Sequence, residues 1–350
     1  MSKKNKIIVI IVSYNGKKYW DELMPTLLEE KYQDIDIDIL VVDNNSSDGS
    51  ADYLARNYPA IKVIRAESNL GFVGANNIAY QYAKENEAKY IYLLNQDTEV
   101  TNGFLRPLYD FAENNKFGSL QSKLRLWPDK KLINTTGNAI HFLGFGYGLG
   151  SQQVDKNNQK IVKINYASGA GVFIGMKALE DLGYLFDETM FMYLEDLDLG
   201  WSLSMLGYDS YLIPNSIVYH KYEFKRSMNL YTYFERNRLW VMLKNYKLGT
   251  LILIFPAWFI MELGQLGFAL VNKRFLEKIK AYSFLFSAKQ LSLLMGKRKN
   301  IQSKRLRSDR QVVGHFKGLI LFQPLDIFLL KIANIFFFIY WRVIKLFIFW

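Results

Sequence analysis

Short apolar runs alternate with longer stretches of helical character in the N-terminal part of the chain, and this alternation restricts the fold more than any other feature. The apolar runs predict strands at residues 7–12, 37–42, 61–64 and 90–94. The stretches between them predict helices at residues 18–31, 48–57 and 74–87. Strands joined by helices of this length form right-handed crossovers in a parallel sheet. We therefore expect an α/β domain built on a parallel sheet.

A polar cluster follows each of these predicted strands. The clusters occupy residues 13–15, 43–48, 69–74 and 95–99. Ligands of open parallel sheets bind at the carboxyl ends of the strands. The sequence therefore predicts a binding site at that edge of the sheet.

Two aspartates in these clusters have a plausible chemical role. Asp43 could accept hydrogen bonds from a nucleobase or a ribose, although a solvated turn with Asp48 as helix N-cap is the alternative. Asp97, two residues after Asn95, could hold a hard divalent cation that keeps waters and also takes diphosphate oxygens. An ordinary turn at the end of the strand is the alternative for Asp97.

An acidic run and a histidine follow later in the chain. Glu195, Asp196 and Asp198 lie within four residues among apolar neighbours, where their charges repel unless a cation, a helix N-terminus or a proton relieves them. Partial burial would raise one pKa and make that group a general base, whereas a surface helix start is the alternative. His220 closes a strand-like run and is either a metal ligand or a structural histidine.

The pattern becomes irregular after residue 117. We expect a strand at residues 166–173, a helix within residues 187–207 and two late strands at residues 208–213 and 216–219. Glycines at 144, 146, 148 and 150 indicate a flexible or closely packed β segment. They form no phosphate loop, since no helix start follows them.

The balance of basic and acidic residues changes near residue 220. Residues 1–220 hold 21 basic and 27 acidic side chains, and residues 221–350 hold 23 basic and 6 acidic ones. Because the basic residues are interleaved with aliphatic runs, anionic lipid is a better partner than nucleic acid. There is no cysteine, which excludes disulfides and thiolate chemistry, and the N-terminus has the character of a cytoplasmic start. We expect a catalytic domain at 1–225 and a basic, apolar, helical membrane-associating region at 226–350.

The C-terminal region contains two apolar segments. Leu248–Val271 is long enough to span a membrane, but residues 272–317 carry 13 basic and 2 acidic side chains, and a single crossing would place them opposite the catalytic domain. A re-entrant or in-plane arrangement is therefore favoured. In residues 325–350, the polar Lys331, Asn334, Arg342 and Lys345 fall on one side of a helix, which is typical of a helix lying flat at a lipid interface. A helix buried against the enzyme or a partner is the alternative.

Taken together, the motifs resemble glycosyltransferase family 2, especially its rhamnosyltransferase-like branch. The resemblance spans residues 6–225 and includes Val41-Val42-Asp43, Asn69-Leu70-Gly71, Asn95-Gln96-Asp97, Glu195-Asp196 and Val218-Tyr219-His220. It implies a GT-A fold and an inverting displacement that depends on Mn²⁺ or Mg²⁺. The implied roles are base recognition for Asp43, metal binding for Asp97 and His220, and general base for Asp196. Other implied substrate-binding residues are Ser13, Asn15, Asn69, Gly71, Asn76, Asn95, Gly169 and Glu195.

Some positions depart from the family pattern. Asn95 occupies the first position of the D-x-D motif, and Trp201-Ser202 stand where related helices often carry an arginine. The run from Arg236 to Trp240 has the wrong spacing for the Gln-x-x-Arg-Trp signature of processive synthases, which argues against a polymerising enzyme.

The sequence therefore indicates a metal-dependent glycosyltransferase at the cytoplasmic face of a membrane, bound peripherally or monotopically. The donor would be dTDP-rhamnose or, second, a UDP-sugar, and the acceptor a lipid-linked or cell-envelope glycan. A homo-oligomer is compatible with this interpretation. The alternative is a GT-A-like scaffold or sugar-binding subunit that has lost catalysis.

Overall fold

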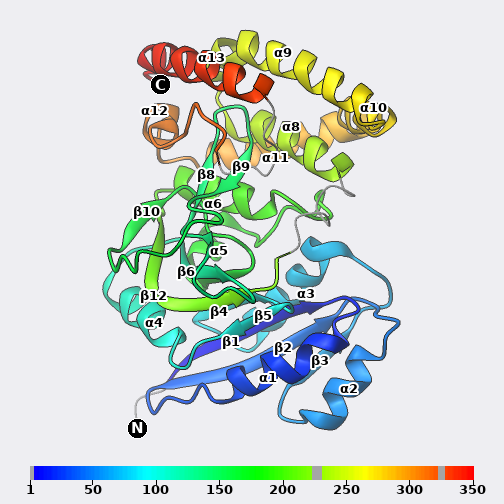
Figure 1. Cartoon of the computed structure of the whole chain (residues 1–350), viewed down its shortest axis with the longest axis vertical. Helices are drawn as coiled ribbons and strands as arrows, with labels where there is room; N and C mark the ends of the chain where they lie inside the picture. The colour runs from blue at the N-terminus through cyan, green and yellow to red at the C-terminus, as the bar shows by residue number, and fades with distance from the viewer. Residues whose placement is uncertain (1–3, 223–230, 322–327) are drawn as a thin grey trace.

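The computed structural model describes residues 4–222, 231–321 and 328–350. A twisted sheet with flanking helices occupies one end of the molecule, and a layer of C-terminal helices covers the other end (Figure 1).

The N-terminal half has the parallel βα arrangement predicted from the sequence. Strands β1 (Asn5–Ser13), β2 (Ile35–Asp43), β3 (Lys62–Arg65) and β4 (Tyr90–Asn95) pair in parallel in the order β4-β1-β2-β3. Helices α1 (Trp20–Leu28), α2 (Ser50–Asn57) and α3 (Gly71–Glu85) connect them. Each element lies within a few residues of its predicted range.

The second half of the sheet is mixed, which the sequence did not predict. Strand β11 (Gly171–Gly175) lies antiparallel between β4 and β6 (Ser119–Leu126), and β12 (Ser210–His220) pairs in parallel with β6. The short strands β5 (Thr98–Val100), β7 (Ile133–Thr135) and β10 (Val162–Ile164) add antiparallel pairs.

Two predicted strand ranges differ from the structure. The strand expected from residue 166 begins only at Gly171, because the Gly171 N–H donates to the Ser168 carbonyl and closes a turn (3.1 Å). The two late strands are one strand, β12, whose pairing with β6 shifts register between Ile213 and Ile217. A bulge of this kind bends the strand without ending it.

The glycine-rich segment is a closely packed hairpin, formed by β8 (Asn138–Ile140) and β9 (Gly146–Gly148). A Cβ atom at Gly146 would lie 2.3 Å from the Tyr166 hydroxyl oxygen, so any larger residue would have to displace the Tyr166 side chain. The remaining helices of this half are α4 (Leu105–Asn114), α5 (Met176–Leu182) and α6 (Glu195–Met205).

The sheet is buried on both faces, which explains the unbroken apolar run in β1. Ile8 and Ile10 belong to one hydrophobic cluster, and Ile7, Val9 and Ile11 belong to the cluster on the opposite face. Strands covered on both sides need apolar residues at every position, whereas half-exposed strands alternate.

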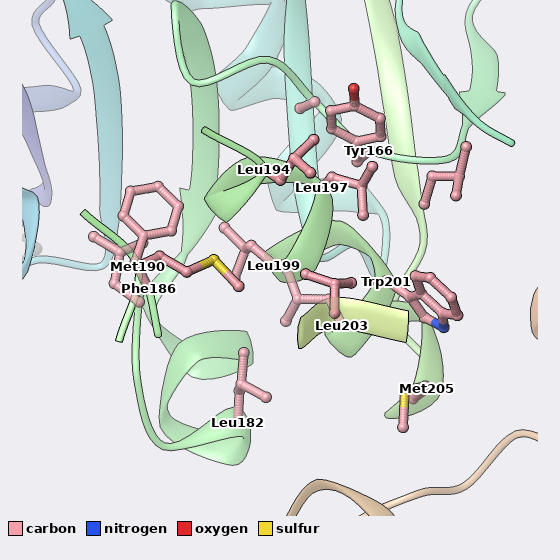
Figure 2. Packing of buried hydrophobic residues seen from close by; sticks show 14 of the residues in the cluster. Tyr166, Leu182, Phe186, Met190, Leu194, Leu197, Leu199, Trp201, Leu203 and Met205 are labelled. Carbon is pink, nitrogen blue, oxygen red and sulfur yellow. The ribbon is translucent and has the colours of Figure 1, made fainter. Parts of the chain in front are cut away.

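Helix α6 lies in the larger cluster and carries the acidic run at its first turn. Figure 2 shows Leu194 and Leu197 near the Tyr166 ring, and Leu199 directed toward Phe186 and Met190. The same cluster includes Leu239 and Trp240 of α8 (Tyr231–Asn245). The C-terminal helices therefore share a core with the sheet.

Buried ion pairs connect α9 (Leu248–Val271) to its neighbours α8 and α10 (Phe275–Leu285). Glu262 is the single charged residue of α9 and is 4% exposed. It pairs with Arg238 of α8 and with Lys278 of α10, the latter at 2.8 Å. The charge in the middle of α9 is thus neutralised by two helices of the body, which holds α9 alongside them.

By length and composition, α9 is the one helix among the described residues that could cross a membrane, and 17% of its most apolar window is buried. The chain ends with α11 (Ala288–Ser303), α12 (Asp309–Val313) and α13 (Phe328–Ile344).

Candidate active site

The carboxyl ends of the central strands bring the first predicted residues together. In the sheet register Ser13 lies beside Asp43, and Val12 lies beside both Val42 and Asn95. The polar clusters that follow β1, β2 and β4 therefore share one edge of the sheet, as the sequence predicted.

The loops after β1 and β2 are joined by hydrogen bonds. The Asn15 N–H donates to Ser46 Oγ (3.0 Å), and Asn15 Oδ1 accepts from the Ser47 N–H (2.9 Å). Asp48 accepts hydrogen bonds from the N–H groups of Lys17 and Ser50, both at 2.9 Å. Asn15 has a φ of 51°, a left-handed conformation that asparagine tolerates better than most residues.

Two buried oxygen atoms at this edge have no hydrogen-bond partner. Asp43 Oδ2 accepts from the Ser46 N–H (3.1 Å), but Asp43 Oδ1 is unpaired, and so is Ser13 Oγ. Asp43 is 4% exposed and Ser13 is fully buried. Buried polar atoms are normally satisfied, so these two oxygen atoms are available to a ligand that supplies N–H or O–H groups.

Asn44 organises the loop that precedes α3, a role that sequence reasoning missed. Its Nδ2 donates to Asn69 Oδ1 (2.9 Å) and to the Gly71 carbonyl (3.1 Å), and its Oδ1 accepts from the Leu70 N–H (2.8 Å). Gly71 has a φ of 70°, and a Cβ there would lie 2.3 Å from the Phe191 carbonyl oxygen. Asn69 and Gly71 thus shape this loop. The signal for Asn44 was its position directly after Asp43.

Asn76 differs from the other predicted residues. It lies inside α3, is 1% exposed, and donates from Nδ2 to the Phe72 carbonyl one turn earlier (2.8 Å). This hydrogen bond therefore lies within its own helix.

Asp97 and His220 approach each other because β5 pairs with β12. His220 Nε2 lies 3.4 Å from Asp97 Oδ1 and 3.5 Å from Asn95 Nδ2. His220 Nδ1 lies 2.9 Å from Oδ1 of Asn134 in β7. Asn134 is a second residue that sequence reasoning missed, since only the pairing of β7 with β6 brings it to the site.

The arrangement around His220 fits a divalent cation. When Nδ1–H donates to Asn134, the lone pair of Nε2 faces the Asp97 carboxylate, and a cation would relieve this contact between two acceptors. The alternative is the tautomer in which Nε2–H donates to Asp97, and that tautomer needs no cation. In the part of the chain that the structure describes, no three His, Asp or Glu residues are grouped to hold a metal. Two protein ligands completed by phosphate oxygens and water are typical of Mg²⁺ sites.

The acidic run lies at the start of α6, after two left-handed residues, Tyr193 (φ 68°) and Leu194 (φ 64°). Asp196 Oδ1 accepts from the Leu197 N–H (2.8 Å), and Asp196 Oδ2 accepts from the Gly169 N–H (3.2 Å). Gly169 is thereby placed next to the predicted base. Burial raises the pKa of the Asp196 carboxyl, which makes it a stronger base than an exposed aspartate.

The other two carboxylates of the run have different environments. Burial and the nearby Asp196 charge raise the pKa of Glu195, whose Oε2 is buried without a partner. Asp198 pairs with Lys244 Nζ (2.5 Å) and accepts from Asn245 Nδ2 (2.9 Å), both from α8. Asp198 is therefore structural, a distinction that its spacing did not reveal.

Comparison with known sequences identifies the family of the chain. Residues 8–183 match the family described as "Glycosyl transferase family 2". The chain is 23% identical over 232 residues to the N-acetylglucosaminyl-diphospho-decaprenol L-rhamnosyltransferase of Mycobacterium tuberculosis, covering 61% of this chain and 75% of that protein. It is 23% identical over 223 residues to the dTDP-rhamnosyl transferase RfbF of Shigella flexneri, covering 62% of this chain and 69% of that protein.

The fold is shared with solved structures. The structure of GalNAc-T7 with UDP, GalNAc and Mn²⁺ matches with a TM-score of 0.55 and 14% identity, over 70% of this chain and 48% of that one. This supports the predicted GT-A-like α/β fold, with the mixed sheet described above. The matched family model, together with these similarities, shows that the chain belongs to glycosyltransferase family 2 and is a glycosyltransferase.

Proposed function

We propose that the enzyme transfers a sugar from a nucleotide diphosphate donor to an acceptor hydroxyl with inversion at C1. The observation that carries this proposal is the grouping of Asp43, with its unpaired Oδ1, the Asp97–His220 pair and Asp196 near one edge of the sheet. Asp196 is linked to this edge through Gly169, because the carbonyl of the next residue, Ala170, accepts from the Asn95 N–H at the end of β4 (3.3 Å). Asp43 and Ser13 would bind the nucleoside through their unpaired oxygen atoms. The catalytically inactive scaffold is disfavoured, because a chain without catalysis has no need to keep these groups together.

In the proposed reaction, the acceptor oxygen attacks C1 as the bond from C1 to the diphosphate oxygen breaks. Asp196 takes the acceptor's proton, and the electron pair of the broken bond leaves with the nucleotide diphosphate. The hydrogen bonds from Gly169 and Leu197 hold the carboxylate in place. Asn15, Asn69, Gly71, Asn95 and Glu195 would line the donor side, and Asn76 would act through α3.

Asp97 and His220 would hold Mn²⁺ or Mg²⁺, with Asn134 orienting the imidazole. When bound, the ion supplies positive charge to the departing diphosphate. The Mn²⁺ in the structurally similar GalNAc-T7 supports this assignment.

The donor and the acceptor are proposed from the relatives. The two relatives described above are named as rhamnosyltransferases, one of them for dTDP-rhamnose and one for a diphospho-decaprenol acceptor. We therefore place dTDP-rhamnose first and a UDP-sugar second as donor. The acceptor would be a lipid-linked or cell-envelope glycan.

We assign residues 1–225 to catalysis and residues 226–350 to docking on the cytoplasmic face of a membrane. Helices α9 and α13 lie next to each other at one end of the molecule (Figure 1) and expose large apolar side chains. These exposed residues include Ile252, Phe255, Phe259, Leu263, Ile332, Ile335, Ile339 and Val343. An apolar surface of this extent, on a region rich in Lys and Arg, suits anionic lipid.

Two residues of the predicted polar stripe, Asn334 and Lys345, bind the backbone of the segment before α13. Asn334 exchanges two hydrogen bonds with the Ile320 backbone (both 2.9 Å), and Lys345 Nζ donates to the Gly314 carbonyl (3.1 Å). On the buried side of the helix, Phe337 and Trp341 join the core. The exposed apolar face, rather than this stripe, would therefore meet the lipid.

Donor binding is tested by thermal shift with dTDP-rhamnose, UDP-sugars and GDP-sugars, each with and without Mn²⁺. A ligand at about 100 times its Kd stabilises a protein by about 2.7 kcal/mol. We expect the largest shift with dTDP-rhamnose and Mn²⁺, and we expect His220→Ala to lose the Mn²⁺-dependent part. His315→Ala, at an exposed histidine just after α12, is the control. If the donor raises the Tm of the unmodified enzyme equally with and without Mn²⁺, donor binding does not require the metal.

Membrane docking is tested by vesicle flotation of the double variant Ile335→Ser/Ile339→Ser, whose side chains are 64% and 57% exposed. Each buried aliphatic side chain contributes about 1.5–3 kcal/mol, so we expect partitioning onto anionic vesicles to fall by roughly 10²- to 10⁴-fold. High salt should release the unmodified enzyme only partly, because salt screens charge and leaves apolar insertion intact.

The matched control for flotation is Val154→Ser/Ile161→Ser, which replaces exposed aliphatic residues outside the C-terminal helices. This variant should float like the unmodified enzyme. If Ile335→Ser/Ile339→Ser floats equally well, the α13 face does not dock on lipid.

A further inference from the structure

We infer that Asn237 of α8 is a positioning residue for the catalytic base, acting through the backbone turn at residues 192–194. The inference rests on the proposed role of Asp196. Asn237 is 1% exposed, and its Nδ2 donates two hydrogen bonds, to the Met192 carbonyl (2.9 Å) and to the Tyr193 carbonyl (2.8 Å). One side-chain amide thus uses both N–H groups on the turn that leads into α6.

This turn has a conformation that it would not hold alone. Tyr193 and Leu194 are consecutive non-glycine residues with φ values of 68° and 64°. Each such residue costs about 1–3 kcal/mol and persists only where the surroundings enforce it. Asn237 supplies that enforcement from outside the local chain.

The turn sets the direction of the helix that carries the base. The Leu194 carbonyl accepts from the Asp198 N–H (2.9 Å), so α6 begins directly on the turn. Asp196 lies in this first helical turn, and its Oδ2 must remain within reach of the Gly169 N–H (3.2 Å). A change in the backbone at residues 192–194 would therefore move the carboxylate.

The same turn adjoins the donor-side loop. The Phe191 carbonyl accepts from the Val73 N–H (3.2 Å), and the Phe191 ring stacks on Tyr233 of α8 with centroids 5.1 Å apart. Residue 191 is thus linked to α3 and α8 independently of Asn237. Loss of Asn237 should accordingly disturb the base side of the site more than the donor side.

The orientation of the Asn237 amide is determined by its neighbour. Arg236 Nε donates to Asn237 Oδ1 (3.0 Å), which leaves both Nδ2 hydrogens for the turn, and Arg236 Nη2 donates to the Thr189 carbonyl (3.1 Å). Helix α8 is held separately by the buried pairs from Lys244 and Arg238. Replacing Asn237 should therefore leave α8 in place.

The test compares Asn237→Ala and Asn237→Asp with the unmodified full-length enzyme. Asn237→Asp keeps the shape but turns an oxygen toward the two carbonyls in place of the donors. Because a misplacement of about 1 Å can cost roughly 10²-fold, we expect kcat to fall about 10- to 100-fold in both variants, with donor Kd within about threefold. The acid limb of the kcat profile should move to lower pH, since a loosened Asp196 is better solvated.

Asn77→Ala is the matched control. Asn77 also exchanges hydrogen bonds with the backbone of this loop, through Nδ2 to the Phe186 carbonyl (3.0 Å) and from the Phe186 N–H to Oδ1 (3.1 Å). Its partner Phe186 lies before the turn at residues 192–194. Replacing Asn77 should therefore lower thermal stability without changing kcat or the pH profile. If the Asn237 variants behave in the same way, Asn237 is merely structural and the inference is wrong.

A double-mutant cycle separates this inference from the proposed function. If Asn237 acts only through Asp196, then Asn237→Ala should cost no further activity when added to Asp196→Asn and assayed by residual turnover. A further loss of 10-fold or more would overturn the inference. High activity of Asp196→Asn alone would instead overturn the assignment of the base, whatever Asn237 does.

Discussion

Asp196→Asn is expected to lower kcat by about 10²- to 10⁴-fold, the usual contribution of general base catalysis. Asparagine keeps the size of the side chain and can still accept one of the backbone hydrogen bonds, from Leu197 or Gly169. It cannot take a proton. Donor Kd should stay within about threefold, because the base acts in the transition state and contributes little to ground-state binding. The measurement is initial-rate kinetics together with donor titration.

The pH dependence of kcat adds a second measurement. Burial raises the pKa of Asp196, so protonation should switch the enzyme off on the acid side at a pH above the ordinary aspartate range. This acid limb should be absent from the residual activity of Asp196→Asn. An Asn variant with unchanged kcat would exclude Asp196 as the base.

Stability provides the control for folding. A carboxyl group with a raised pKa in the folded state contributes stability below its unfolded pKa and loses it as the pH rises through the folded pKa. The neutral asparagine avoids that loss. Asp196→Asn should thus melt no lower than the unmodified enzyme at pH 8, and the two should converge in acid. If activity is lost while the Tm is unchanged or higher, the loss comes from the missing base and not from unfolding.

Lys244→Met is expected to produce the largest loss of stability. Lys244 is 1% exposed and pairs with Asp187 (3.0 Å) and Asp198 (2.5 Å), which are also buried. Burial would lower the pKa of Lys244, but the charges of its acidic partners outweigh burial and hold the pKa well above its usual value. Removing one partner of a buried pair leaves an uncompensated charge and costs about 3–5 kcal/mol. Tm should fall by roughly 6–20 °C, since about 1 kcal/mol corresponds to 2–4 °C in large domains.

The control for this variant is Lys177→Met, at a lysine that is 75% exposed and pairs with Asp181 at 2.7 Å. Exposed pairs contribute little, so its Tm should not change measurably. Activity in Lys244→Met should fall as well, because Asp198 anchors the helix that carries Asp196. A Tm equal to that of the unmodified enzyme would show that the buried pair adds no net stability.

The parts of the fold that were predicted correctly depend on patterns within short stretches of sequence. The apolar runs of β1, β2 and β4 and the polar residues that follow them lie within single segments of chain, so periodicity reveals them directly. The position of β11 between β4 and β6 could not be predicted in this way. The direction of β11 is set by its pairing with strands more than 40 residues away in sequence. The sequence of a short apolar run does not specify which strand it pairs with.

The candidate site likewise has residues that the sequence predicted and partners that only the structure revealed. The sequence by itself determined which groups could carry the chemistry: Asp43, Asp97, Asp196 and His220, each at the end of a strand or the start of a helix. Only the tertiary structure decided their partners. Asn134 reaches His220 across 86 positions, and Asn237 reaches the turn before Asp196 across 44. Likewise, Lys244 makes Asp198 structural while Asp196 stays available. These roles depend on distances through space between segments remote along the chain, and local sequence patterns do not encode such distances.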